Sequence, residues 1–298
     1  MTKHKATTGK PGSADADQDL VVLLLQVPRT NDKKELAAEQ MFASLHGLLL
    51  FPSGKLFTAP KRVRISFEIA VLKRRIGFYV AVPRYLVGFI EEQIYAQYPN
   101  VQITEVADYS TPKASNSKIL GTEMRFIASQ ALPIKTFQSF EVDPLATITA
   151  TLAKFDPDEE AWIQLVLRPA PKSWHKKSER YISGLRTGNS NLLSVLWKPP
   201  EQGQAPKLTE YEQARANGAE DKSHKLAFET TLRIIYKASE TSTQASLKLQ
   251  SIVAGYKQFN TTYMNGFEQT KPVASNILLA RYHHRIVGTK PLLLNIEE

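Results

Sequence analysis

The sequence predicts an α+β fold made of two tandem ferredoxin-like modules, the second with a long insertion. Three observations predict it. Residues 19–109 follow the order strand, helix, strand, strand, helix, strand. Residues 121–270 repeat this order around an inserted segment, residues 171–222. The connections of the first module are short and marked by proline, glycine and charged residues, as expected for a β-α-β-β-α-β unit.

The first strand and helix follow from hydrophobic patterning. Residues 20–27 form a nearly continuous apolar run, which predicts a buried strand and is far too short to span a bilayer. Asp32 and Glu35 have the spacing of a capping box. Apolar residues then recur every three or four positions, so a helix is expected from Asp32 to about Leu49. Pro52 and its neighbours end it.

A hairpin and a second helix complete this module. Residues 62–72 alternate between apolar and polar, which predicts a strand with one exposed face. A charged turn leads into a second strand, residues 76–82. Apolar positions from Leu86 to Tyr98 predict a helix, and the last strand begins at Val101. Right-handed crossovers place both helices on one face of a four-stranded antiparallel sheet.

The second module begins after a polar, turn-rich linker, residues 110–120. Residues 121–140 are apolar and alternating, which predicts a strand or a pair of strands. Asp143 precedes a proline at the first helical position, so a helix is expected to run to about Phe155. A strand follows over residues 161–167.

The insertion and the remaining elements are less regular. A helix is expected from Lys172 to about Arg186, followed by a loose segment over residues 187–209. Residues 226–238, 241–259 and 262–268 then predict a strand, a helix and a strand. An irregular α+β domain is the alternative for this half.

Composition bounds the kind of protein. The chain has 298 residues, of which 42% are hydrophobic and 22% charged, enough for two domains with real cores. Residues 1–18 lack apolar anchors and are expected to be a disordered tail. The absence of cysteine excludes disulfides and thiolate metal sites. No signal peptide or transmembrane run is visible, which favours a cytoplasmic protein, peripheral to the membrane only through a larger complex.

The net charge of +9 is concentrated in two clusters. The first hairpin carries Lys61, Arg62, Arg64, Lys73, Arg74 and Arg75, and the inserted helix carries Lys172, Lys176, Lys177, Arg180 and Arg186 around Trp174, His175 and Tyr181. Such clusters are solvated faces or protected sheet edges in many proteins. Interleaved aromatic residues also suit phosphate or partner contacts. The candidate contact residues are therefore Lys172, Trp174, Lys176, Lys177, Arg180, Lys73, Arg74 and Arg75.

Motifs that carry chemistry are missing from the sequence. No phosphate-binding loop occurs, no histidines have metal-ligand spacing, and no carboxylates form an acid–base pair. The strands also lack the aromatic platform of an RNA-recognition module, because Phe78 and Tyr79 are adjacent and face opposite sides. We therefore predict no catalytic, metal or cofactor residues and a chain that is not an enzyme by itself.

A series of local matches resembles the N-terminal region of the type IV secretion, conjugation-type ATPases of candidate-phylum bacteria, which are similar to coupling proteins. The series comprises residues 37–48, 65–69, 77–83, 91–99 and 106–109. The resemblance implies a membrane segment before this region and a P-loop motor after it. Residues 292–298 resemble the junction just before that motor, so residues 271–298 are expected to be a segment that leads toward it. The motor motifs are absent here, which implies a truncated chain or a separately encoded accessory half.

The leading interpretation is a non-catalytic region of a secretion or DNA-transfer ATPase that positions the motor and mediates assembly or substrate contacts. Its candidate partners are a P-loop motor domain, other secretion-system subunits, DNA and further copies of the chain. The alternative is a stand-alone nucleic-acid-binding module that uses the basic clusters. An enzyme of another class is a third interpretation.

Overall fold

A computed structural model of the chain describes residues 19–28, 35–51, 61–111, 117–186, 208–239, 242–271 and 273–298. The predicted tail, the Asp32 cap and most of the predicted loose segment lie outside these residues.

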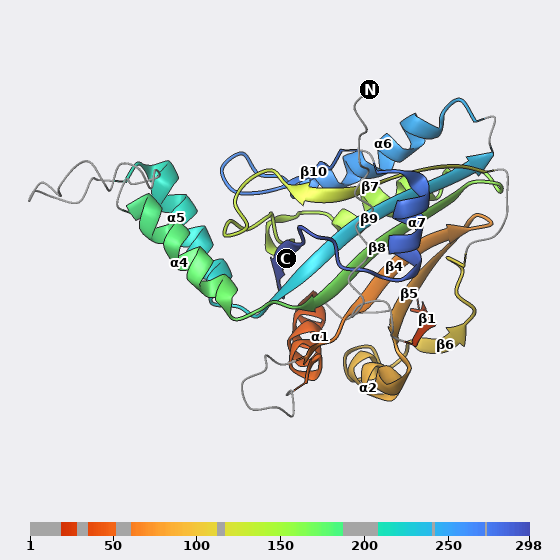
Figure 1. Cartoon of the computed structure of the whole chain (residues 1–298), viewed down its shortest axis with the longest axis horizontal. Helices are drawn as coiled ribbons and strands as arrows, with labels where there is room; N and C mark the ends of the chain where they lie inside the picture. Colours follow the sequence, from red (N-terminus) through yellow and green to blue (C-terminus); the bar gives the residue numbers. More distant parts are fainter. Residues whose placement is uncertain are drawn as a thin grey trace, which may run out of the picture.

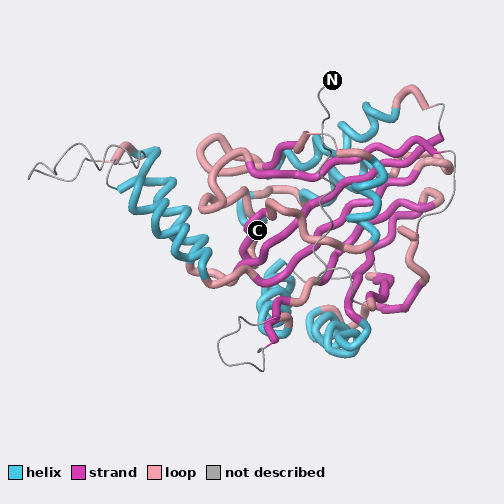
Figure 2. The backbone as a smooth tube through the Cα atoms, in the orientation of Figure 1, coloured by secondary structure: helices cyan, strands magenta, loops and turns pink. Residues whose placement is uncertain are grey.

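The described residues form an α+β fold around one nine-stranded antiparallel sheet (Figures 1 and 2). Its strands lie in the order β10-β7-β9-β8-β4-β5-β1-β6, and β11 pairs with β9. The strands are β1 (Leu20–Gln26), β4 (Ile65–Leu72), β5 (Arg75–Pro83), β6 (Gln102–Val106), β7 (Ser117–Phe126), β8 (Glu160–Pro169), β9 (Ala227–Ser239), β10 (Phe267–Gln269) and β11 (Leu292–Asn295). A separate two-stranded ribbon pairs β2 (Leu50–Phe51) with β3 (Lys61–Arg62).

Helices cover both faces of the sheet. They are α1 (Glu35–Leu48), α2 (Val87–Gln97), α3 (Pro144–Leu152), α4 (Ser173–Arg186), α5 (Glu210–Ser223), α6 (Ala245–Tyr256) and α7 (Ser275–His283), with short 3-10 turns η1 (Arg84–Leu86), η2 (Phe137–Ser139) and η3 (Lys257–Phe259). The buried clusters place α1, α2, α3 and α6 on one face and α7 on the other. In Figure 1, α4 and α5 project together from one end of the sheet.

The two halves of the chain order their strands in the same way. In the first half, β4-β5-β1-β6 places the strands as second, third, first and fourth in chain order. In the second half, β8-β9-β7-β10 repeats that arrangement. The halves meet where β4 pairs with β8, from Ile65 opposite Leu167 to Val71 opposite Ala161. The sheet is thus continuous, rather than divided into two four-stranded sheets as the sequence predicted.

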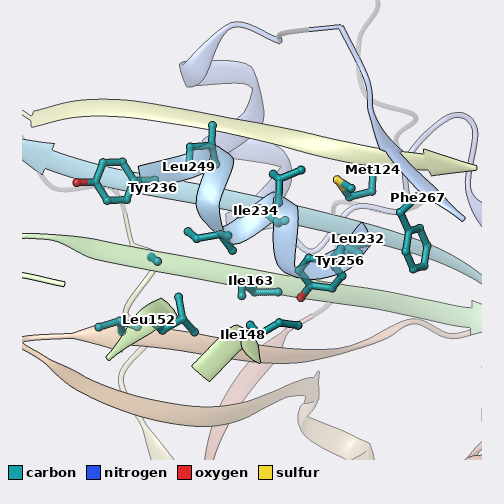
Figure 3. Packing of buried hydrophobic residues seen from close by; sticks show 14 of the residues in the cluster. Met124, Ile148, Leu152, Ile163, Leu232, Ile234, Tyr236, Leu249, Tyr256 and Phe267 are labelled. Carbon is teal, nitrogen blue, oxygen red and sulfur yellow. The ribbon is translucent and has the colours of Figure 1, made fainter. Parts of the chain in front are cut away.

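Two apolar clusters fill the face of the sheet that α1, α2, α3 and α6 cover. Around α1 and α2, Leu45 and Ile90 pack with Val80 of the sheet, and all three are fully buried. The larger cluster lies under α3 and α6. Figure 3 shows part of it, with Leu249 of α6 near the strand that carries Ile234. Apolar residues on one face of each helix thus define the core of each half.

The prediction that one face of residues 62–72 is exposed is wrong. Both faces of β4 are covered, and Ser66, Glu68 and Ala70 on the supposedly exposed face are at most 2% accessible. The cover comes from α7 and from residues 107–111, which lie over this face. The alternation of apolar and polar residues identified the strand. It did not reveal the layer that covers the polar face, because the polar residues of that face are buried in a hydrogen-bonded network.

Several predicted boundaries in the second half also need correction. Residues 117–120 of the predicted linker belong to β7, and residues 127–140 are loop and a 3-10 turn rather than a second strand. The insertion contains a second helix, α5. Residues 271–298 are not a plain connection, since they provide α7 and the buried strand β11.

None of the helices in the described ranges combines the length and the apolar character needed to cross a bilayer.

Candidate functional site

The most prominent feature outside the sheet is a helical hairpin, here called the arm, formed by α4 and α5. The chain leaves the sheet at the end of β8 and returns at the start of β9, where Pro169 is paired with Phe228. The two helices pack through Ile182 and Ala219. An ion pair of 2.7 Å between Arg186 Nη2 and Glu220 Oε2 also joins them.

The base of the arm is fixed to the body by buried contacts. Trp174 is 6% exposed and packs with Ala170, Ala227 and Leu293. Such a large buried aromatic contributes much of the contact area at the point where the arm leaves the sheet.

A fully buried ion pair adds a second attachment. Lys222 Nζ of α5 lies 3.0 Å from Glu298 Oε2, and neither side chain is accessible. Lys222 also donates to the Leu132 carbonyl, and the Glu298 carboxylate accepts from the backbone N–H groups of Ile134 and Asn295. Burial lowers the pKa of Lys222, against the charge of Glu298, which favours the ammonium form.

The structure brings four of the predicted contact residues together. Lys172, Lys176, Lys177 and Arg180, here called the basic stripe, are all exposed and lie on α4 or directly before it. Spacings of four residues place Lys172, Lys176 and Arg180 on successive turns of one side. Within the described ranges, none of the four forms an ion pair with an acidic group. The stripe therefore offers uncompensated positive charge.

Trp174 does not belong to this surface. Sequence reasoning grouped it with the cations because it lies among them in the chain. Helical geometry turns it to the opposite side, where it holds the base of the arm.

The remaining predicted contacts, Lys73, Arg74 and Arg75, are exposed but lie at the other end of the sheet. Leu72 ends β4 beside the start of β8, whereas the arm follows the end of β8. Positive φ angles of 49° at Lys73 and 64° at Arg74 give the hairpin a turn of type I′ geometry. These residues and the basic stripe do not form one surface.

Two of the other predicted hairpin cations, Arg62 and Arg64, are engaged in contacts. Arg62 Nη1 lies 2.9 Å from Glu229 Oε2, and buried Arg64 donates through Nη2 to the His284 carbonyl at 3.2 Å. The six-residue cluster predicted around the hairpin is therefore not a single patch.

Sequence reasoning missed a line of polar side chains across the middle of the sheet, here called the polar row. Glu68 of β4, Gln164 of β8, Arg233 of β9 and Glu123 of β7 are opposite one another in register. Gln164 donates through Nε2 to Glu68 at 2.9 Å and accepts from Arg233 at 2.9 Å. Arg233 Nε lies 2.7 Å from Glu123 Oε1. The row thus crosses from the first half into the second.

Residues from the end of α7 and from the 107–111 segment close over this row. Arg285 pairs with both Glu68 and Asp108, and Tyr109 donates to Glu68 Oε2 at 2.6 Å. Tyr282 shares a hydrogen bond of 2.7 Å with Tyr109. Among the groups described, this network is fully paired, which indicates a structural role in holding α7 on the sheet.

Burial and neighbouring charges shift the pKa values of Asp108 and Tyr109, two residues of the segment that covers the row. Burial opposes the ionised form of Asp108, but hydrogen bonds and charge from Arg285, with hydrogen bonds from Ser110, outweigh it and lower the pKa. Burial raises the pKa of Tyr109, and the neighbouring Glu68 carboxylate raises it further. Tyr109 is therefore a neutral donor to a charged acceptor.

Among the described residues, no group of three or more histidine, aspartate or glutamate side chains is placed to hold a metal ion. The arm is the candidate site that stands out, because its base is buried and its stripe carries unpaired charge.

The solved structures that are similar to this chain include two oxidases of low similarity. One is the xylooligosaccharide oxidase from Myceliophthora thermophila C1 in complex with xylobiose, at 11% identity and a TM-score of 0.35, with 85% of this chain and 46% of that chain covered. The other is a chitooligosaccharide oxidase, at 9% identity and a TM-score of 0.35, with 94% and 55% covered. The chain thus spans about half the length of these structures.

The prediction that the chain is not an enzyme by itself is contradicted by this comparison, in which the two structures named above are oxidases. TM-scores of 0.35 carry no argument for the reaction of this chain, so no oxidase activity follows from them.

Comparison with curated proteins finds no match. A family model described as a domain of unknown function, DUF8128, matches residues 17–284, which include both halves of the sheet and the arm. The chain belongs to the DUF8128 family.

Proposed function

We propose that this chain is the region of a type IV secretion or conjugative DNA-transfer ATPase that positions the motor and mediates assembly, with the arm as its contact element. The observation that carries the proposal is the arm, whose buried base fixes the direction of an exposed basic stripe. A fixed projecting helix pair suits docking to a partner, because little conformational freedom is lost on binding. The residue series in 37–109 that resembles such ATPases supports the same role.

In this proposal the two halves are tandem ferredoxin-like modules. The shared strand order in each half supports this, as does the placement of each helix pair on one face. The arm is then an insertion between the second and third strands of the second module.

Charge reversal on the stripe tests the assembly role. The protein with Lys172, Lys176, Lys177 and Arg180 changed to glutamate is expected to bind a hexameric P-loop motor from the same genome at least about tenfold more weakly, since each exposed ion pair contributes roughly 0.2–1 kcal/mol. Size-exclusion chromatography with light scattering and biolayer interferometry measure this association without DNA.

A matched control changes four exposed lysines outside the arm, Lys154, Lys257, Lys271 and Lys290, to glutamate. It alters the net charge equally and is expected to keep wild-type affinity. Equal weakening in both variants, or no association of the wild type with the motor, would contradict the proposal.

The alternative function is nucleic-acid binding by the same stripe, favoured by its four exposed cations, which form no ion pair with any described residue. If all four contact phosphates, the affinity for a DNA oligonucleotide is expected to fall roughly a hundredfold between 50 and 200 mM salt, because each contact releases counterions. Changing the four residues to alanine is expected to flatten this dependence, as measured by fluorescence anisotropy. The same salt dependence in that variant would exclude the stripe as the DNA contact.

A further inference from the structure

An apolar cavity lies where the two halves meet, on the face of the sheet that α1, α2, α3 and α6 cover. Its volume is about 350 Å³. Ile69 of β4 and Ile163 of β8, which are opposite each other in register, both line it. Volumes in this range are typical of small-molecule sites.

The cavity is elongated. Its lining extends across neighbouring strands from Leu25 of β1 to Leu232 of β9. Four inter-strand steps of about 4.8 Å give a length of roughly 19 Å. A volume of about 350 Å³ spread over this length makes a channel that suits an extended chain better than a ring system.

One polar group in the lining, the Tyr256 hydroxyl, lacks a partner within the part of the chain that the structure describes. Tyr256 is 8% exposed and lines the cavity, and its hydroxyl has no hydrogen bond to any described residue. Figure 3 shows the Tyr256 hydroxyl extending from α6 toward Ile163. Burial raises the pKa of Tyr256, so the hydroxyl stays protonated and can donate. An acceptor in the cavity would give this hydroxyl a hydrogen bond that no described residue supplies.

The other polar lining residues are already engaged. Glu68 pairs with Arg285 on the opposite face of the sheet, and the Tyr79 ring packs against Tyr109 on that face. Glu298 is neutralised by Lys222. Among the residues that the structure describes, no lysine, arginine or histidine lines the cavity. A charged ligand would therefore lose its hydration without gaining a partner.

We propose that this cavity binds a neutral, extended hydrocarbon chain with an oxygen acceptor, such as an acyl ester, whose oxygen accepts a hydrogen bond from Tyr256. The site is separate from the arm and does not depend on the assembly role proposed for it.

Binding of methyl decanoate to the full chain, measured by calorimetry, tests the proposal. Saturable binding is expected, with an increase in the thermal unfolding midpoint. Tyr256→Phe is expected to lower the affinity for the ester roughly two- to tenfold, the effect of losing one neutral hydrogen bond. The affinity for decane, which has no acceptor, is expected to be the same in both proteins, and decanoate is expected to bind more weakly than the ester.

Leu165→Trp narrows the channel and is expected to abolish ester binding. If that variant fails to fold, the comparison between wild type and Tyr256→Phe still decides the outcome, because removal of one hydroxyl conserves the shape of the side chain. No saturable ester binding by the wild type, or equal ester affinity in Tyr256→Phe, would overturn the proposal.

A flotation experiment distinguishes two sources of the hydrocarbon ligand, a membrane lipid and a free ester. If the wild-type protein floats with phosphatidylcholine vesicles and Tyr256→Phe floats with them less, a membrane lipid is supported as the source. Ester binding without co-flotation would support a free ester.

Discussion

Replacement of Arg285 by methionine is expected to reduce the free energy of unfolding by about 3–5 kcal/mol, the usual loss when one partner of a buried ion pair is removed. Arg285 is 1% exposed and pairs with Glu68 and Asp108. Its removal leaves the Glu68 carboxylate buried without its cation. Urea unfolding followed by circular dichroism measures the loss.

The matched control for this prediction is Arg125→Met. The Arg125–Glu268 pair has a similar separation, 3.1 Å, but both side chains are well exposed. Its removal is expected to cost at most about 1 kcal/mol. A loss of less than 1 kcal/mol in Arg285→Met would show that the polar network does not stabilise the fold.

The loss of stability in Arg285→Met is also expected to depend on pH. The lowered pKa of Asp108 contributes stability that is present above the ordinary aspartate pKa and is lost as the pH falls through the lowered value. Without Arg285 this contribution is largely absent at every pH. The stability difference between wild type and variant is therefore expected to shrink below about pH 4. A difference that is constant from pH 7 to pH 3 would contradict this role for Asp108.

Trp174→Ala is expected to have the second large effect, a loss of about 3–5 kcal/mol for truncating a buried aromatic residue. The loss should be concentrated at the base of the arm, where Trp174 packs with Ala170, Ala227 and Leu293. Urea unfolding gives the magnitude, and hydrogen exchange shows whether α4 loses protection first.

A neighbouring exposed residue provides the control. Lys176→Ala, two positions away on the same helix, is expected to change stability by no more than about 0.5 kcal/mol. If Trp174→Ala were as mild as Lys176→Ala, Trp174 would not anchor the arm.

Local patterns predicted the first half well because its elements are marked by local signals. The apolar run of residues 20–27, the alternation in 62–72 and the helical spacing between Leu86 and Tyr98 each correspond to an observed element. The cover over β4 could not be predicted in the same way. It depends on α7 and Arg285, more than 200 residues later in the chain.

Two features of the candidate site had different signals in the sequence. The apolar side of α5 is made by Ala216 and Ala219, which produce little hydrophobic periodicity. Its capping box, Thr209 with Glu212, is a local signal that would have identified the helix start. The polar row had a weaker signal, a glutamate and an arginine inside otherwise apolar strands, and its pairing depends on sheet register.

The pairing of β4 with β8 has a consequence for the newly made chain. Until residues 160–169 leave the ribosome, β4 has a partner on one side only, β5, and its other edge is open. An open edge with apolar residues is a template for pairing with another chain. Translation of the first half therefore includes an interval in which misassembly competes with folding, and it ends when the second half supplies β8.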